Sequence, residues 1–301
     1  MKKENKKPLL SPKSDLIFKL IFGDRKNIDI LSDLLQAVLD LPKEELLEIT
    51  IVDPHLHPES PDNKLGILDL KLHTKSHKRI NVEIQVLRDP HMRQRVVYYN
   101  SKMVVEQLSK GDRYGELNPS ISIIILDYCL IKENDVYHNK YQLYDRKTHS
   151  TFTDMVEINT LELPKLPTEP QRTKLWEWLT FFVASKEEEF DMISQENPMI
   201  KKAVGVLKEL SEDERTRLLE EAREKARKDE ASRYEGALEI GREEGRVEGR
   251  KEGRKEGREE GKKEGRVEER YNIAKKMKDQ GINMDIIESV TGLSKEELET
   301  I

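Results

Sequence analysis

Two carboxylates, those of Asp69 and Glu83, are spaced so that a short hairpin would bring them together. Like charges facing each other on neighbouring strands repel, and the repulsion grows when the charges are removed from water. A divalent cation would offset it, because proteins hold Mg²⁺ with one or two carboxylates, several waters and phosphate oxygens. The amide of Gln85 could orient a water beside such an ion. The three residues therefore outline a metal site.

The elements that must position these residues are two short strands. Residues 68–73 alternate between apolar and polar side chains, and so do residues 80–86. A period of two is expected of a strand with one buried face. The polar residues 75–78 can close an antiparallel hairpin, and a loop centred near Ser76 puts Asp69 opposite Glu83. An ordinary half-exposed hairpin with acidic outward positions is the alternative, and the alternation leaves it open.

Several motifs occur in order around this hairpin. They are SDLIFKLIFG upstream, LGILDLKL and INVEIQV in the hairpin, and RVVYYNSKMVVEQLSKGDRY downstream. In these residues the chain, from Ser11 to Leu163, resembles the Rpn family of recombination-promoting nucleases and transposase-like proteins. That family belongs to the PD-(D/E)XK nuclease superfamily. The resemblance implies an α/β fold like that of restriction endonucleases, with a mixed sheet flanked by helices.

The same resemblance implies an activity. It implies a divalent-metal-dependent DNA endonuclease, a hydrolase of phosphodiester bonds, with Asp69 and Glu83 as metal ligands and Mg²⁺, or Mn²⁺ or Ca²⁺, as the cofactor. The biological role would lie in recombination, transposition or defence against phage and other mobile elements. A noncatalytic DNA-binding or self-associating scaffold that retains the fold is the competing hypothesis, and the intact pair of carboxylates favours the enzyme.

Further site residues follow from the resemblance. The superfamily usually has Lys two residues after the Glu, where this chain has Gln85. Because Gln carries no charge, either Lys71 on the same face takes that role or the reaction depends more on the metal. Tyr98 matches a family position and is a candidate catalytic residue, and Gln107 and Asp15 are possible additional ones. Asp15 also has a local explanation, since a carboxylate in the first turn of a helix favours the helix dipole.

Positive charge follows the hairpin. The apolar pattern predicts a helix from Met92 to Ser109, and four cations lie on it or just before it. These could contact DNA phosphates: Arg88, Arg93, Arg95 and Lys102. An ordinary solvated helix face is the alternative.

Composition sets outer limits. The 301 residues carry a net charge of −6, which counts modestly against nucleic-acid binding, although a local basic patch is enough to hold phosphates. The single Cys129 excludes an intrachain disulfide and suits a reducing cytoplasm. No apolar run reaches 18 residues, and no signal-peptide core follows the basic start, so we expect a cytoplasmic protein without a membrane partner.

The order of the predicted elements divides the chain. We expect helices from Ser14 and over 28–39, strands over 47–52 and 120–126, and two extended segments over 138–147 and 152–161, with prolines from Pro164 marking a linker. The expected regions are a disordered basic tail at 1–10, the nuclease domain at 11–163, a helical region at 164–235, a Gly/Arg/Glu repeat at 236–270 and a small helical module at 271–301.

The repeat has the most unusual composition. Glycine recurs every fourth residue from Gly241 to Gly265, with Arg or Lys after each and Glu before the next. On one helix these residues would form glycine, basic and acidic ridges, which suits a second copy better than a lone helix, since each Gly costs about 0.8 to 1 kcal/mol relative to Ala. We therefore prefer self-association, giving a homo-oligomer such as a dimer, to a flexible charged linker. The final module predicts short helices broken at Gly281 and Gly292, with Ser294 as an N-cap; a helix-turn-helix DNA reader is the alternative.

Overall fold

The computed structural model describes residues 8–52, 55–56, 66–67 and 69–301. The chain divides into two compact units, Met1–Lys228 and Asp229–Ile301. Most of the expected disordered tail at 1–10 lies outside the described residues. None of the helices in the described part of the chain combines the length and apolarity needed to cross a membrane.

The first unit is built on a mixed sheet whose strand order is β1-β4-β5-β6-β8-β7. Strands β5, β6 and β8 run parallel to one another, and the other neighbours are antiparallel. The strands are β1 (Thr50–Val52), β4 (Leu70–His73), β5 (Arg79–Gln85), β6 (Ser120–Leu126), β7 (His138–Tyr144) and β8 (Thr151–Glu162). A small second sheet pairs β2 (His55–Leu56) with β3 (Gly66–Ile67). The predicted buried strand over 120–126 is confirmed as the central β6.

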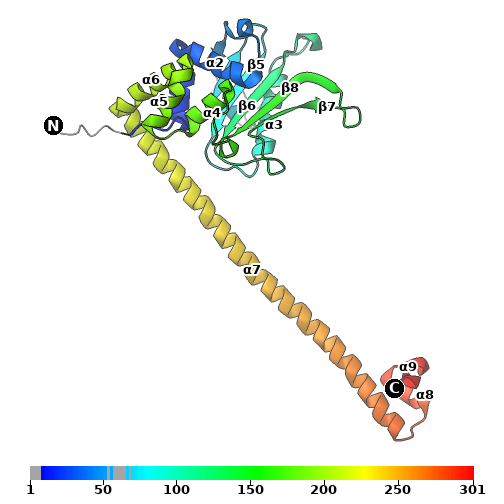
Figure 1. The fold of residues 1–301 in the computed structure, drawn as a ribbon. Helices are drawn as coiled ribbons and strands as arrows, with labels where there is room; N and C mark the ends of the chain where they lie inside the picture. Colours follow the sequence, from blue (N-terminus) through cyan, green and yellow to red (C-terminus); the bar gives the residue numbers. More distant parts are fainter. Residues whose placement is uncertain (1–7, 53–54, 57–65, 68) are drawn as a thin grey trace, which may run out of the picture. The chain divides into compact units, whose positions relative to one another are not determined.

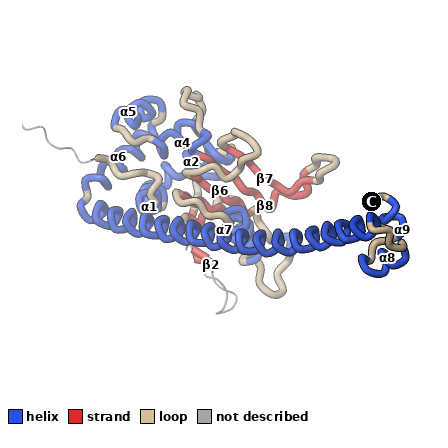
Figure 2. Tube along the Cα trace, turned by 90° about the horizontal axis from the view of Figure 1, so that it is seen from below, coloured by secondary structure: helices blue, strands red, loops and turns tan. Residues whose placement is uncertain are grey.

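Helices cover both faces of this sheet (Figures 1 and 2). One face carries α1 (Asp15–Phe22), α2 (Ile28–Leu39), α4 (Lys174–Val183), α5 (Glu187–Glu196) and α6 (Pro198–Glu212), and the opposite face carries α3 (Met92–Val105). Short 3₁₀ turns lie at Arg25–Asn27, Lys43–Leu46, Tyr114–Glu116 and Leu163–Lys165. The mixed α/β architecture implied by the resemblance is thus confirmed.

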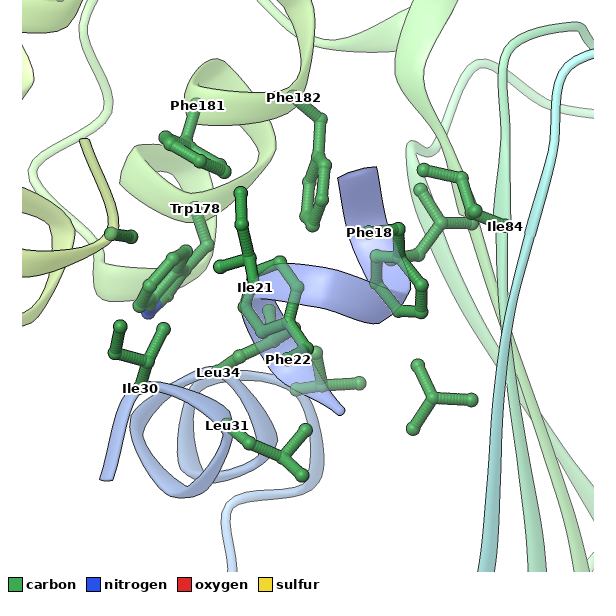
Figure 3. Close-up of a cluster of buried hydrophobic side chains, with 14 of the residues drawn as sticks. Phe18, Ile21, Phe22, Ile30, Leu31, Leu34, Ile84, Trp178, Phe181 and Phe182 are labelled. Atoms are coloured by element: carbon green, nitrogen blue, oxygen red, sulfur yellow. The ribbon is translucent and has the colours of Figure 1, made fainter. Parts of the chain in front are cut away.

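The main core lies between the sheet and the larger helical layer. In Figure 3, aromatic side chains of α1 and α4 meet the aliphatic side chains of α2 and β5. The labelled residues are Phe18, Ile21, Phe22, Ile30, Leu31, Leu34, Ile84, Trp178, Phe181 and Phe182. Residues after Pro164, expected as a separate helical region, therefore share the core of the sheet, and the boundary between compact units falls after Lys228.

The hairpin has the predicted register. Leu70 pairs with Val82 and Lys71 with Asn81, so continuing by one residue sets Asp69 opposite Glu83. The alternative of an ordinary half-exposed hairpin is wrong, however, because Lys71, Asn81 and Glu83 are buried, and Glu106, just after α3, pairs with Lys71. Burial removes these polar groups from water, which makes their partners decisive.

Three element boundaries differ from expectation. The strand expected over 47–52 begins at Thr50, because Lys43–Leu46 forms a 3₁₀ turn. The helix expected over 92–109 ends at Val105, where Glu106 and Gln107 turn to contact other elements. The first hairpin strand begins at Leu70, which leaves Asp69 in a bend just before it.

The second unit contains most of α7 (Glu214–Asp279), then α8 (Met284–Thr291) and α9 (Lys295–Glu299). Gly281 and Gly292 adopt positive φ at the predicted breaks, and Ser294 forms the predicted capping box with Glu297. A small apolar cluster including Ala274, Ile287 and Leu298 joins the end of α7 to these short helices. The repeat at 236–270 is helical, and nearly all of its side chains are exposed.

Candidate metal centre and active site

Asp69 is held by both of its carboxylate oxygens. Its Oδ2 accepts a hydrogen bond from the backbone N–H of Ile84 at 3.0 Å, across the open end of the hairpin. Its Oδ1 lies 3.1 Å from Nζ of Lys19, which comes from α1. Burial and the charge of nearby Asp15 raise the pKa of Asp69, while Lys19 and the Ile84 amide act in the opposite direction.

Glu83 is the more deeply buried carboxylate. It lies in β5 with 2% of its surface exposed, and its Oε1 has no hydrogen-bond partner among the described residues. Burial raises the pKa of Glu83 to about 7, the charge of Asp69 adds to the rise, and Arg95, Asn81 and Lys19 oppose it. A buried carboxylate oxygen without a donor is costly unless a cation or a water completes its shell.

Lys19, in α1, contacts two acidic residues, Asp69 and Asp15. Besides its contact with Asp69, its Nζ lies 2.8 Å from Oδ1 of Asp15, one helical turn earlier in α1. Arg223, near the start of α7, binds the other oxygen of Asp15 at 2.8 Å. Burial acts to raise the pKa of Asp15, but its contacts with Lys19, Asp69 and Arg223 outweigh burial and lower it.

Neither Lys19 nor Arg223 was predicted from the sequence as a site residue. An i, i+4 pairing of Asp15 with Lys19 in α1 was the available signal for the first. No local pattern marks Arg223, which lies 208 residues from its partner Asp15.

Gln85 and Lys71 differ in their availability. Gln85 ends β5 on the same side as Glu83, half-buried, and no partner for its side-chain amide lies within the described residues. The Nζ of Lys71 lies 2.9 Å from Oε2 of Glu106, just after α3, and the pair is largely buried. The Lys71 ammonium is thus engaged by a carboxylate from another element.

The four predicted DNA-binding cations lie in different surroundings. Arg95 is near enough to influence Glu83; it also lies 3.8 Å from Asp89 and 5.7 Å from the ring centre of Tyr99. Arg88 is exposed in the loop after β5. Lys102 lies 5.6 Å from the ring centre of Tyr98, which is 43% exposed on α3.

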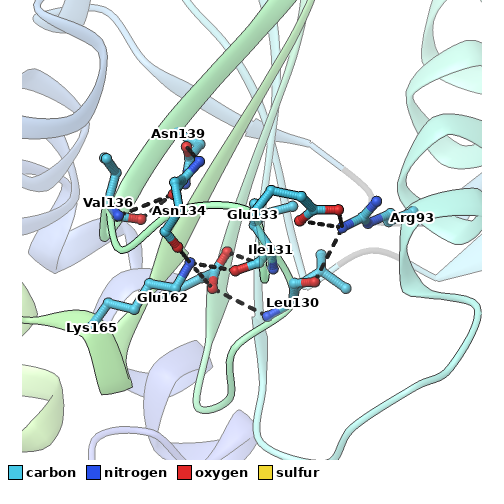
Figure 4. Close-up of polar contacts among 9 residues, drawn as sticks. All are labelled: Arg93, Leu130, Ile131, Glu133, Asn134, Val136, Asn139, Glu162 and Lys165. Carbon is cyan, nitrogen blue, oxygen red and sulfur yellow. Dashed lines mark hydrogen bonds and ion pairs between the residues drawn. The ribbon is translucent and has the colours of Figure 1, made fainter.

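Arg93 points to another part of the fold (Figure 4). Its Nη2 lies 3.1 Å from both carboxylate oxygens of Glu133 and 3.3 Å from the carbonyl oxygen of Leu130. The loop that carries these groups is anchored by the buried Glu162, which accepts the N–H of Leu130 and pairs with Lys165 at 2.9 Å. Arg93 therefore joins α3 to that loop.

Gln107 is bonded to the backbone around it. Its Nε2 donates to the carbonyl oxygens of Met103 and Asn118 and to Oγ of Ser120, and its Oε1 accepts the N–H of Asn118 at 2.9 Å. These contacts tie the end of α3 to the start of β6.

The donor set at Asp69 and Glu83 fits a hard divalent cation. Both are carboxylates, and Oε1 of Glu83 supplies a buried oxygen that has no hydrogen-bond partner in the described part of the chain. Within the described residues, no group of three or more His, Cys, Asp or Glu side chains is arranged to hold a metal ion. The remaining ligands of an ion here would be waters and substrate oxygens, which is usual for Mg²⁺.

Comparison with known proteins bears on the whole first unit. Residues 12–237 match the family model described as PD-(D/E)XK nuclease family transposase. Neither the curated proteins nor the solved structures gave a match. The matched span covers the sheet, the two carboxylates and the first turns of α7, so the chain belongs to the PD-(D/E)XK nuclease family transposases.

Proposed function

We propose that this protein is a divalent-metal-dependent DNA endonuclease that hydrolyses phosphodiester bonds. The observation that carries the proposal is the buried Glu83 facing Asp69 with an unsatisfied oxygen. Two acids at one hairpin end, removed from water, raise the energy of the metal-free site and favour a bound cation. Family membership supports a nuclease-like activity on DNA.

Asp69 and Glu83 would hold Mg²⁺, or Mn²⁺ or Ca²⁺ in its place. Such an ion, when bound, lowers the pKa of water and neutralises charge that develops on the phosphate. The Ile84 N–H fixes one oxygen of Asp69, which orients that carboxylate before substrate arrives. Gln85 would hydrogen-bond the attacking water or a phosphate oxygen, since its amide is not engaged within the described residues.

The DNA would lie against α3 and the end of the hairpin. Arg95 is the predicted cation nearest to Glu83, and Arg88 lies in the loop that follows Gln85. The exposed Tyr98 and the half-buried Lys102 form a pair on α3 that suits contact with a sugar or phosphate. We assign these four residues to substrate binding, and Arg93 to a weaker part in it because Glu133 already binds it.

Plasmid cleavage tests this function. Supercoiled DNA is incubated with the purified protein in Mg²⁺, Mn²⁺, Ca²⁺ or EDTA, beside Asp69→Ala and Glu83→Ala. Cleavage by the parent only with a divalent ion, and its loss in both variants, is the expected result. Glu48→Ala, which removes an exposed acid paired with Lys75, is the control and should cleave like the parent. Binding of DNA without cleavage in any ion would instead favour the noncatalytic scaffold.

The repeat carries a second part of the proposal. We infer that residues 236–270 associate with a second copy, giving a homo-oligomer such as a dimer. This exposed helix carries a basic and an acidic ridge, and the segment has equal numbers of basic and acidic residues. A nuclease paired in this way would act on two strands or two sites, as recombination, transposition or defence against mobile DNA requires. We place this activity in the cytoplasm.

A further inference from the structure

One ammonium group contacts a candidate metal ligand in the described part of the chain. The Nζ of Lys19 lies 3.1 Å from Oδ1 of Asp69 and 2.8 Å from Oδ1 of Asp15. Its side chain is 35% exposed, so it lies at the boundary between the buried carboxylates and solvent. A substrate phosphate approaching Asp69 would meet this group.

The other nearby groups are less suited to supply positive charge at the reacting phosphate. Gln85 is neutral. Lys71 is buried against Glu106, and moving it would leave that carboxylate uncompensated in the protein interior. Arg95 spreads its charge over a guanidinium already placed between Asp89 and the ring of Tyr99.

We propose that Lys19 is a catalytic residue, whose ammonium contacts a nonbridging oxygen of the scissile phosphate. This inference rests on the proposed endonuclease function. In the reaction, water loses a proton to solvent as its oxygen bonds to phosphorus, the bond to the sugar oxygen breaks, and that oxygen takes a proton from solvent. Lys19 keeps its own protons and donates hydrogen bonds to the phosphate as its negative charge rises. It thereby supplies the charge that Gln85 lacks.

Asp15 and Arg223 are positioning residues in this arrangement. Each oxygen of the Asp15 carboxylate is bound by a cation, Oδ1 by Lys19 and Oδ2 by Arg223. Next to it, Oγ of Ser14 hydrogen-bonds Glu220, which gives α1 a second contact with the start of α7. Asp15 thus acts through Lys19, and the first turns of α7, included in the family match, help to hold that lysine in place.

The decisive variant is Lys19→Met, which keeps most of the aliphatic stem and removes the charge. Single-turnover cleavage at saturating metal should fall about 10²- to 10³-fold, the range for losing one transition-state donor. Affinity for uncleaved DNA in EDTA should change less than about threefold, because one phosphate contact among many is lost. Calorimetric binding of Mn²⁺ to the DNA-free protein should be retained or tightened, since Asp69 loses a competing cation.

Controls separate catalysis from structure. Lys202→Met removes an ammonium of similar exposure that pairs with Asp29, and should leave cleavage unchanged. Asp15→Asn or Arg223→Met should slow cleavage about tenfold in the parent and have little further effect in Lys19→Met, because groups that act as a unit are not additive. Additive losses would show that Asp15 and Arg223 do not act through Lys19.

The outcomes distinguish this inference from the proposed function. If the parent cleaves DNA and Lys19→Met cleaves equally fast, the role of Lys19 is overturned and the function stands. If Lys19→Met loses Mn²⁺ binding or its folded structure along with cleavage, its role is structural and the inference also fails. If the parent does not cleave DNA with any of the metals tested, the proposed function fails. Tighter Mn²⁺ binding by Lys19→Met would then support only the contact between Lys19 and Asp69.

Discussion

At the scale of the residue, the ionised side chain of Glu83 destabilises the folded protein when no metal is bound. Its pKa rises from 4.5 to about 7 on folding, so the native state binds a proton that the unfolded chain releases between those values. Stability from this group is therefore fully present below about pH 4.5 and is lost as the pH rises through about 7. A tenfold change in proton affinity is about 1.4 kcal/mol, so the loss is on the order of 3 kcal/mol.

Glu83→Gln should remove this dependence. In EDTA the variant should have a larger free energy of unfolding than the parent at pH 8, and the difference should shrink towards pH 5. Denaturant unfolding at both pH values measures it. From the sequence, removing either carboxylate would relieve the repulsion, but Asp69→Ala leaves Lys19 and the Ile84 N–H without their partner. An equal gain in stability from both variants would contradict the structural difference between the two acids.

The affinity for metal should depend on the protonation of Glu83 as well. A cation competes with the proton on Glu83, so the affinity for Mn²⁺ should fall as the pH drops from 8 to 6. Calorimetry at several pH values, with the proton release read from buffers of different ionisation enthalpy, measures this coupling. In Glu83→Gln, binding should be weak and nearly independent of pH across that interval.

Variants of Gln85 test whether an uncharged amide at this position is enough for full cleavage activity when Lys19 supplies the positive charge. Gln85→Ala should lower the cleavage rate because an orienting hydrogen bond is lost, whereas Gln85→Lys should keep activity. In a Lys19→Met background, Gln85→Lys should restore part of the rate, since it returns an ammonium to the site from the end of β5. Single-turnover kinetics on the parent and the four variants decides it, and an Ala variant as fast as the parent would leave Gln85 as a strand residue only.

At the scale of the element, the parts with strong local signals were predictable. The alternation around Asp69 and Glu83 fixed the hairpin register, because a slip of one residue would turn every apolar side chain to the wrong face. The burial of the polar face could not be predicted from the alternation, because it depends on tertiary contacts such as that of Lys71 with Glu106, 35 residues further along the chain. The same reason hides Arg223, whose contact with Asp15 joins segments 208 residues apart.

Gln107 belongs to the scale of the element as well, since its contacts hold the end of α3 on β6. Gln107→Ala should lower the free energy of unfolding by on the order of 1 to 2 kcal/mol, because partly buried backbone groups lose their partners. The folded fraction should still cleave DNA at the rate of the parent. Denaturant unfolding alongside cleavage measures both; a slow variant of undiminished stability would return Gln107 to the site.

At the scale of the whole molecule, part of α7 has a sequence that makes an isolated helix unstable. Its glycines at 241–265 weaken it, and like charges recur at i, i+4 along its basic and acidic ridges. A Cβ added at any of these glycines would meet no atom within 4 Å in the single chain. The glycines are therefore not required by packing within one copy, and the proposed association with a second copy would give them a physical use.

Alanine substitution at the glycines separates these two states of the helix. Replacing Gly245, Gly249, Gly253 and Gly257 should raise the helicity of a dilute tail peptide, by about 0.8 to 1 kcal/mol per site, while weakening association because the added methyl groups separate the two backbones. Val247→Ala and Val267→Ala, which leave the glycine ridge intact, are the controls. Circular dichroism over a dilution series measures helicity, and light scattering measures the oligomer, which should be smaller when residues 236–301 are deleted.

Salt should also weaken association, since facing Arg and Glu ridges are screened over about 10 Å at 0.1 M. If the alanine peptide associates as well as the parent, or if the truncated protein keeps its oligomeric state, the helix is a spacer and the copies are joined elsewhere.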